Sequence, residues 1–220
     1  MIDKQVQDFD TALAGLGDGA TIMVSGFGAA GAPHDLMDAV LERGCRDLII
    51  ISNNAGEGER GLARLMQERR IRKVICSFPT SSNSEIVKEL YSAGAIDLEI
   101  VPQGTLSERI RAAGAGIGGF YTRTSVGTPI AEGKEKRTID GVDYVFEAPL
   151  HADFAFVKGR LADRWGNLTY NKSARNFGPS MAMAGKITVA QVDRIVPLGD
   201  IDPEQIVTPG VFVDRVMEIA

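Results

Sequence analysis

Asp18-Gly-Ala-Thr-Ile-Met-Val-Ser-Gly-Phe-Gly-Ala-Ala-Gly-Ala-Pro33 is the stretch of sequence that decides the fold. Its first part, Thr21–Val24, is continuously apolar or β-branched, which is typical of a strand buried in a parallel sheet. Gly26, Gly28 and Gly31 follow as a turn, and the closing proline stands where the start of a helix tolerates one. A strand that leads through glycines into a helix presents backbone N–H groups at the positive end of the helix dipole. The stretch therefore predicts a site for an anion, such as a phosphate, a carboxylate or the oxyanion of an acyl transfer.

Outward from this stretch, strand-like and helix-like patterns alternate at short intervals as far as residue 115. The predicted strands span 21–24, 47–52, 73–77 and 98–102, and the predicted helices span 3–16, 33–44, 59–69, 84–93 and 105–115. The last of these helices is expected to begin at a capping box, Thr105-Leu-Ser-Glu108. Such alternation is typical of right-handed βαβ units. The sequence therefore predicts an α/β fold with an open, mainly parallel sheet and flanking helices.

The pattern changes between residues 116 and 150. Asp140-Gly141 separates two β-prone runs there, which is a strong hairpin signal. This segment is predicted to be an irregular excursion that carries a small antiparallel hairpin. The elements expected after it are a strand at 154–158, a short helix from Gly178, and strands at 187–192 and 195–196. Because no repeat, low-complexity tract or linker divides the chain, residues 1–220 are expected to form one domain.

The composition limits the possible functions. The formal net charge of the 220 residues is −5, which argues against a general nucleic-acid-binding protein. The two cysteines, Cys45 and Cys76, have no metal-ligand spacing, and reduced thiols are expected. With only two histidines, no histidine-based metal site is expected. The amino terminus lacks a signal pattern and no apolar run is long enough to span a membrane, so a cytoplasmic location is expected.

Gly26-Phe-Gly-Ala-Ala-Gly31 also matches the G-x-G-x-x-G pattern of dinucleotide-binding proteins. That function requires the third glycine to lie in the following helix, and an acidic residue to end the second strand, where it binds the ribose. Here Pro33 moves the start of the helix beyond the third glycine, and the second strand leads into Ser52-Asn-Asn54 without an acid. A nicotinamide or flavin cofactor is therefore not favoured. A glycine turn needed only for chain reversal is the plainer alternative.

Polar or amide-rich loops follow the other predicted strands too. They are Asn53-Asn54 after the second strand, Phe78-Pro79 after the third and Gln103-Gly104 after the fourth. Because the carboxyl ends of parallel strands border the ligand crevice of an open sheet, these loops are expected to converge on the glycine turn. Amide donors without a general base suit an acyl-transfer site that holds a carboxylate or an oxyanion. Taken singly, each loop has a plainer explanation as turn-forming or solvent-exposed residues.

These stretches resemble the signature motifs of one family, the 3-oxoacid coenzyme A transferases. The resemblance begins with residues 18–33 and continues in Ser52-Asn-Asn-Ala-Gly56, Pro102-Gln-Gly-Thr-Leu106 with Glu108-Arg109, Gly127-Thr128, Gly166-Asn-Leu-Thr-Tyr170, Ala174-Arg-Asn-Phe177 and Thr208-Pro-Gly-Val-Phe212. It covers nearly the whole chain. The runs 163–170 and 178–184 are most similar to those of members that act on 3-oxoadipate, and the acetoacetate-type members are the nearest relatives of these.

The resemblance implies an enzyme that moves coenzyme A from succinyl-CoA to a 3-oxo acid, with 3-oxoadipate favoured and acetoacetate or a short-chain fatty acid as the alternative. In this family a glutamate attacks the acyl-CoA thioester, and the thiolate returns to the glutamyl carbonyl to form an enzyme-bound thioester. In split members the glutamate lies in the B subunit, in a Ser-Glu-Asn-Gly context that this sequence lacks. The chain is therefore expected to be the A subunit of an αβ or α₂β₂ assembly. Coenzyme A thioester is then a substrate, and no cofactor or metal is expected.

The same resemblance assigns roles to individual residues. Gln103, in Pro-Gln-Gly, matches the glutamine that stabilises the oxyanion, and Asn53 and Asn54 are expected to contact the substrate carboxylate. The glycine turn is expected to form a wall or backbone donors near the thioester. The complete expected substrate-binding set is Gly26, Phe27, Gly28, Gly31, Asn53, Asn54 and Gly104. Ser25 stands where the family usually has a glycine, which changes how closely the backbone there approaches a ligand.

Some alternatives stay open at this point. Besides the transferase, the chain is compatible with a dinucleotide-dependent oxidoreductase or with a non-catalytic sensor of a small molecule on the same kind of sheet. Cys76 is interpreted as a core cysteine rather than a nucleophile, because no histidine follows in a suitable relation. Arg164, Lys172 and Arg175 have two interpretations: contacts with coenzyme A phosphates or a second substrate carboxylate, and contacts with the B subunit.

Overall fold

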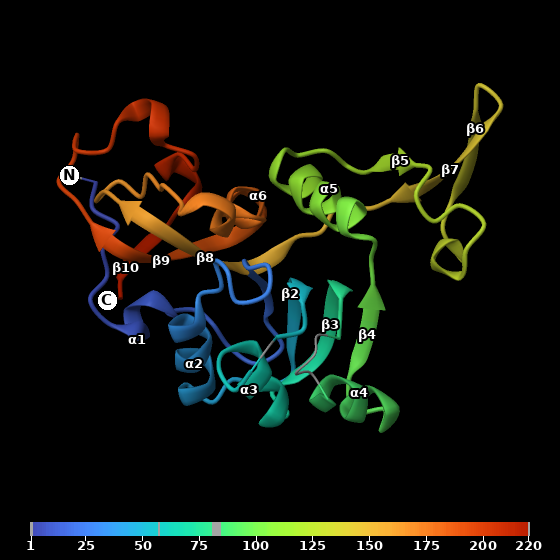
Figure 1. Ribbon diagram of the computed structural model, residues 1–220, viewed down its shortest axis with the longest axis horizontal. Helices are drawn as coiled ribbons and strands as arrows, with labels where there is room; N and C mark the ends of the chain where they lie inside the picture. The colour runs from blue at the N-terminus through green and yellow to red at the C-terminus, as the bar shows by residue number, and fades with distance from the viewer. Residues whose placement is uncertain (1, 57, 81–84, 220) are drawn as a thin grey trace.

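The computed structural model describes residues 2–56, 58–80 and 85–219 and is built on a seven-stranded sheet in the order β10-β9-β8-β1-β2-β3-β4 (Figure 1). Its neighbouring strands all pair in parallel. The strands are β1 (Thr21–Val24), β2 (Leu48–Asn54), β3 (Ile71–Phe78), β4 (Asp97–Ile100), β8 (Ala152–Ala162), β9 (Gly185–Ile195) and β10 (Arg215–Glu218). The α/β fold with an open parallel sheet, predicted from the alternating patterns, is confirmed.

Helices cover both faces of this sheet (Figure 1). On one face lie α2 (His34–Glu42), α3 (Leu62–Gln67) and α4 (Glu85–Ser92), and on the other lie α5 (Gln103–Gly114) and α6 (Gly178–Ala184). Successive residues of one strand supply the two cores. Ile22 and Val24 of β1 pack with α2–α4, whereas Met23 packs with α5 and α6. Because β1 is buried on both faces, its sequence is apolar throughout instead of alternating.

A second, antiparallel sheet in the order β5-β7-β6 projects from the main sheet (Figure 1). It consists of β5 (Phe120–Thr122), β6 (Lys136–Ile139) and β7 (Val142–Glu147). Asp140 and Gly141 form the turn between β6 and β7 with φ values of 50° and 76°, as a two-residue type I′ hairpin requires. The hairpin predicted within residues 116–150 is confirmed, and β5 adds a third strand.

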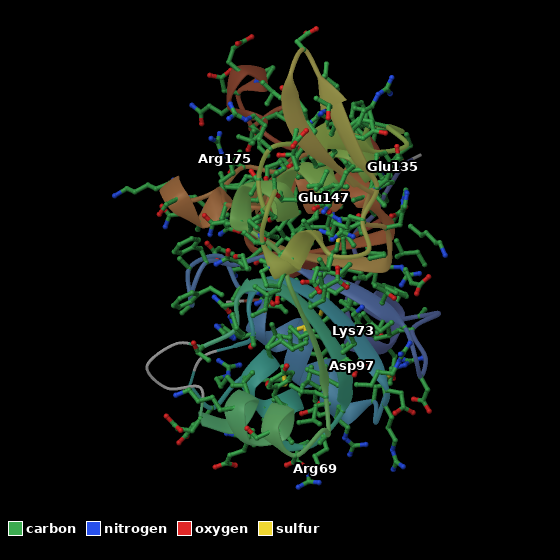
Figure 2. The ribbon with its side chains drawn as sticks, turned by 90° about the vertical axis from the view of Figure 1, so that its right-hand side faces the viewer. Arg69, Lys73, Asp97, Glu135, Glu147 and Arg175 are labelled. Atoms are coloured by element: carbon green, nitrogen blue, oxygen red, sulfur yellow. The ribbon has the colours of Figure 1, made fainter. Side chains whose placement is uncertain are left out.

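Glu147, at the end of β7, ties the small sheet to the rest of the molecule (Figure 2). Its side chain is 2% exposed, and its carboxylate lies 2.5 Å from Lys134 Nζ and 3.7 Å from Arg109 Nε on α5. Arg109 also contacts Glu99 of β4 at 3.1 Å, and the other oxygen of Glu99 lies 2.7 Å from Lys73 Nζ of β3. A buried carboxylate is tolerated only when it is paired. This chain of ion pairs therefore holds the small sheet against α5 and β4.

The amino-terminal segment differs from its prediction. The helix expected over residues 3–16 is wrong except for one turn, α1 (Phe9–Ala12). Before this turn the chain runs beside β10, where Val6 N donates to Val216 O at 2.9 Å and Val216 N donates to Lys4 O at 2.7 Å. The otherwise unpaired edge of β10 supplies partners for these backbone groups, which outweighs the helical spacing of the apolar residues.

Other differences concern the limits of elements. The late strands predicted at 187–192 and 195–196 are one strand, β9, because its pairing with β8 continues to Ile195. The short strand β10 was not predicted. Helix α3 is shorter than the predicted 59–69, since Gly61, with φ of 59°, precedes its first turn. The predicted start of a helix at Ser84, and residues 81–83 of the preceding predicted loop, lie outside the described residues.

Candidate functional site

The candidate site lies at the carboxyl ends of β1–β4. The chain leaves β1 where the sheet extends in two directions, towards β2 on one side and β8 on the other, and such a position favours a ligand crevice. A pocket of about 390 Å³ is found at this edge. Its lining residues are Phe27, Gly28, Asn53, Asn54, Ser77, Phe78 and Gln103. The structure thus brings together residues that lie at the carboxyl ends of four different strands or just after them, as the strand order predicts.

Asn53 is the centre of the polar side of this pocket. It is 3% exposed, and its Oδ1 accepts two hydrogen bonds of 2.7 Å, from Ser77 Oγ and from Gln103 Nε2. The Ser77 hydroxyl also lies 3.1 Å from the backbone oxygen of Asn53. Two donors on one amide oxygen fix the orientation of the Asn53 carboxamide, and among the described residues its NH₂ group has no hydrogen-bond partner.

Gln103 occupies the first position of α5, and this corrects the predicted start of that helix. The capping box at Thr105 is wrong: Thr105 is buried inside the helix, and Pro102 is the N-cap residue with no side-chain cap. The helix begins two residues earlier than predicted because the fixed φ of Pro102 leads directly into the first turn. Gln103 is therefore at the positive end of the helix dipole. One N–H of its side chain donates to Asn53, and the second has no partner in the part of the chain that the structure describes.

Asn53 and Asn54 were expected in a loop but lie at the end of β2. The strand is longer than predicted because Asn54 pairs with Phe78 of β3. Asn54 Oδ1 accepts from Gly56 N at 3.2 Å, which closes the turn after the strand. The carboxamide of Asn54 is therefore partly used in the local structure, whereas that of Asn53 is directed by its pocket neighbours.

The glycine turn contributes less to the pocket wall than expected. Phe27 and Gly28 line the pocket, whereas Gly26, Gly31 and Gly104 do not. Gly26 is buried and lines a second, smaller cavity behind the turn. A Cβ on Gly31 would lie 2.2 Å from Ala174 O, so this glycine is a packing contact. Gly104 follows Gln103 in α5 and has open space around it.

Ser25, which replaces the usual glycine of the related motif, turns its side chain into the protein. Its Oγ donates to Gly31 O at 2.7 Å and accepts from Lys158 N at 3.1 Å. The residue is 3% exposed. Ser25 therefore braces the glycine turn from inside, and its hydroxyl does not line the 390 Å³ pocket.

The geometry argues against dinucleotide binding at the glycine turn. Pro33 is the N-cap of α2, so Gly31 lies outside the helix and cannot pack within its first turn. No acidic residue ends β2, whose last residues are Ser52, Asn53 and Asn54. Both features that a dinucleotide site requires after its first and second strands are missing here.

Two residues of the site were missed by sequence reasoning. The sequence predicts no role for Ser77, because the polar loop after the third strand is expected to begin at Phe78. In the structure Ser77 and Phe78 both belong to β3 and line the pocket. Asn176 was noted only as part of a family motif, but its side chain bonds to the glycine turn. The only available signal for Ser77 was its place at the end of an apolar strand.

Cys76 is a core cysteine, as interpreted from the sequence. Its side chain is fully buried with the α2–α4 core, and burial raises the pKa of its thiol to about 12. Burial also raises the pKa of Cys45. We therefore expect neither thiol to react with a disulfide reagent at pH 8 until the protein unfolds, because the thiolate is the reacting species. With a reagent such as DTNB, two equivalents of thiol per chain should react in guanidinium chloride, and almost none should react in the folded protein. Rapid release of one equivalent from the folded protein would contradict the buried placement.

The described part of the chain contains no helix that is both long and apolar enough to cross a membrane.

Comparison with known proteins gives concordant results. The family model described as "Coenzyme A transferase" matches residues 6–219. The A subunit of a 3-oxoadipate CoA-transferase from Pseudomonas putida is 59% identical over 220 residues, covering 100% of this chain and 95% of the relative. The A subunit of a succinyl-CoA:3-ketoacid coenzyme A transferase from Xanthomonas campestris is 49% identical over 215 residues, covering 97% of this chain and 88% of the relative.

The fold is shared with solved structures. An acyl-CoA transferase from Escherichia coli O157:H7, solved as a thioester complex with CoA, superposes with a TM-score of 0.83 at 22% identity. The match covers 99% of this chain and 47% of that one, so this chain spans about half the length of the Escherichia coli protein. At this level of identity the likeness concerns the fold.

Proposed function

Because this chain belongs to the coenzyme A transferase family, we propose that it is the A subunit of a two-subunit enzyme that moves coenzyme A from succinyl-CoA to a 3-oxo acid, with 3-oxoadipate favoured. The observation that carries this proposal is the pair of carboxamides of Asn53 and Gln103, held together with the Ser77 hydroxyl in the pocket at the carboxyl ends of the strands. The cluster offers neutral N–H donors and no general base. Acyl transfer through an oxyanion needs such donors.

The proposed reaction has two balanced halves. A glutamate carboxylate attacks the thioester carbonyl of succinyl-CoA and expels the coenzyme A thiolate, which leaves a mixed anhydride. The thiolate then attacks the glutamyl carbonyl, releases succinate and leaves a glutamyl-CoA thioester. The 3-oxo acid takes coenzyme A by the same steps in reverse and frees the glutamate. Each attack on a carbonyl places negative charge on its oxygen, and that charge is what the pocket must stabilise.

The residues of this chain supply the stabilising groups in this proposal. The second N–H of Gln103 is directed at the developing oxyanion, and the dipole of α5 adds to its effect. The Asn53 NH₂ group, oriented by Ser77, donates to the oxyanion or to the substrate carboxylate. Phe27 and Gly28 form another part of the pocket wall. Gly26, Gly31 and Gly104 support this wall and the helix start rather than contacting substrate.

The nucleophile is proposed to come from the B subunit. Among the described residues that line the pocket, none carries a carboxylate or an imidazole. The sequence contains no Glu-Asn-Gly. Phe27 and Phe78 remain 56% and 58% exposed at the pocket, which supports the arrival of a second chain at this edge. The relatives, which are named as A subunits, support the same arrangement.

We further propose that the reaction uses no bound cofactor or metal and takes place in the cytoplasm. The thioester bond itself supplies the energy for transfer, so an amide-lined pocket and a carboxylate nucleophile are sufficient. The two cysteines are both free and buried, which is compatible with a reducing compartment.

The purified chain alone is expected to show no transferase activity, because its nucleophile is missing. Activity should appear when it is combined with the product of the neighbouring reading frame, provided that this partner carries Ser-Glu-Asn-Gly. The measurement is the formation of 3-oxoadipyl-CoA from succinyl-CoA. The matched control is a partner with that glutamate changed to alanine, which should assemble and remain inactive. Substantial turnover by the lone chain would refute the two-subunit proposal.

The same assay decides between acceptors, and two other observations decide between function classes. Comparing kcat/KM for 3-oxoadipate, acetoacetate and acetate tests whether 3-oxoadipate is the preferred acceptor, since a relative named for 3-ketoacids is also similar. Tight binding of NADH by the isolated chain would instead support an oxidoreductase. The absence of a Ser-Glu-Asn-Gly partner next to this reading frame would favour a ligand sensor.

A further inference from the structure

Asn176, which follows the 3₁₀ turn η2 (Lys172–Arg175), bonds across the molecule to the glycine turn. Its Oδ1 accepts from Gly26 N at 3.0 Å, although the two residues are 150 positions apart. Its Nδ2 donates to Ala30 O at 3.0 Å. The same amide is also tied to its own segment, since Oδ1 accepts from Phe177 N at 2.7 Å and Nδ2 donates to Ala174 O at 2.9 Å. One carboxamide thus makes four hydrogen bonds and joins both ends of the turn.

The backbone of Asn176 is held in a rare conformation to make these contacts. Its φ is 26° and its ψ is −117°, a combination that a residue with a Cβ seldom adopts. Strained backbone persists only where surrounding contacts over-determine it, and such positions gather at functional sites. The opposing surface is fitted to it: a Cβ on Gly31 would lie 2.6 Å from Asn176 Nδ2. The glycine turn and the segment around Asn176 are therefore closely packed against each other.

The glycine turn needs such support because its own residues specify its shape weakly. Gly26, Gly28 and Gly31 have φ values of 134°, 60° and 74°, and glycine adopts many other conformations at little cost. Within the turn the backbone closes through one short bridge, in which Phe27 N donates to Ala30 O at 3.0 Å and Ala30 N donates to Phe27 O at 3.3 Å. Asn176 bonds to Gly26, which precedes this bridge, and to Ala30, which is one of its two residues.

We propose that Asn176 is a positioning residue that fixes the glycine turn, so that Phe27 and Gly28 line the same pocket as Asn53 and Gln103. This inference rests on the transferase function proposed above. An asparagine suits the role because one planar group provides both an acceptor for Gly26 N and a donor for Ala30 O. Aspartate keeps only the acceptor, and glycine keeps only the conformational freedom. The proposal assigns to Asn176 no contact with the substrate.

The test uses Asn176→Gly in the assembled two-subunit enzyme. Glycine relieves the backbone strain, so folding and assembly should persist while the side-chain bonds are lost. We expect kcat to fall about 10- to 100-fold with a smaller change in KM, because small displacements of a positioned group cost rates of this order. The kcat of Asn176→Asp should lie between those of the wild type and Asn176→Gly. If Asn176→Gly does not fold, Asn176→Asp replaces it as the test. The matched control is Asn171→Gly, an exposed asparagine before the same 3₁₀ turn with no side-chain cap, which should keep wild-type kcat.

A second measurement does not depend on activity. Hydrogen exchange of the backbone amides of residues 26–31 in the chain itself should quicken at least about tenfold in Asn176→Gly and stay unchanged in Asn171→Gly. Unchanged exchange in Asn176→Gly would overturn the proposal, and so would faster exchange with wild-type kcat. If the wild-type assembly transfers no coenzyme A, the transferase function fails while exchange still decides whether Asn176 holds the turn.

Discussion

Replacing Gln103 by alanine in the assembled enzyme is expected to lower kcat by about 10²- to 10³-fold, the usual cost of losing one oxyanion donor. The structure places Gln103 at the start of α5 with one N–H bonded to Asn53 and the other left for the pocket. Because the charge on the carbonyl oxygen develops only near the transition state, the loss should appear in kcat more than in KM. Steady-state kinetics with succinyl-CoA and 3-oxoadipate measure it.

Two companion variants sharpen this experiment. Gln67→Ala removes an exposed glutamine at the end of α3, away from the pocket, and should keep wild-type kcat. Gln103→Glu keeps the size of the side chain but sets a carboxylate against Asn53 Oδ1, an acceptor, so it should be at least as damaging as alanine. Size-exclusion chromatography confirms assembly in each case. A fully assembled Gln103→Ala enzyme with unchanged turnover would refute the oxyanion role.

Replacing Gly31 by alanine is expected to cause a large loss of stability. The φ of Gly31 is 74°, and its added Cβ would lie 2.2 Å from Ala174 O, a backbone atom that cannot rotate away. The left-handed conformation costs roughly 1–2 kcal/mol for a residue with a Cβ. Overpacking adds roughly 1–3 kcal/mol. Together these lower the free energy of unfolding by roughly 2–5 kcal/mol, or the midpoint of thermal unfolding by roughly 4–20 °C for a chain of this size.

Thermal unfolding of the isolated chain, followed by circular dichroism, measures this effect. Gly17→Ala is the matched control, because a Cβ there meets nothing within 4 Å and the backbone φ lies outside the left-handed range. It should leave the midpoint nearly unchanged. Equal midpoints for Gly31→Ala and Gly17→Ala would show that the glycine turn yields easily, and would contradict the close packing against the Ala174–Asn176 segment.

The fold was largely predictable because its evidence is local. A strand buried on both faces is apolar throughout, and the run Leu48–Ile51 shows this in four adjacent letters. The hairpin at Asp140-Gly141 is equally local, since two positive φ values determine the turn. The segment before α1 was mispredicted because its conformation depends on Val216, at the other end of the chain. No pattern within residues 3–16 reports on that contact.

The same distinction applies to the candidate site. Strand ends placed Asn53, Gln103 and Phe27 near one another, because parallel strands bring their carboxyl ends to one edge. The partners that orient these groups were not visible. Ser77 acts on Asn53 from 24 residues away and Asn176 acts on Gly26 from 150 residues away, and neither has a local signature. The predicted start of α5 is two residues late because the capping-box pattern at Thr105 lies inside the helix, and Pro102 is the N-cap instead.

The position of β8 between β1 and β9 has a consequence for how the chain acquires its structure. β1 is complete at Val24, but the strand that pairs with its second edge begins only at Ala152, roughly 130 residues later. At a synthesis rate of about 5–20 residues per second, the backbone N–H and C=O groups on this edge of β1 remain without their partner strand for on the order of ten seconds. The backbone groups of Lys4 and Val6 remain without their partner for longer still, because Val216 is synthesised near the end of the chain. The nascent chain thus exposes an unpaired, aggregation-prone strand edge throughout most of translation. A prematurely terminated chain would keep that edge exposed permanently.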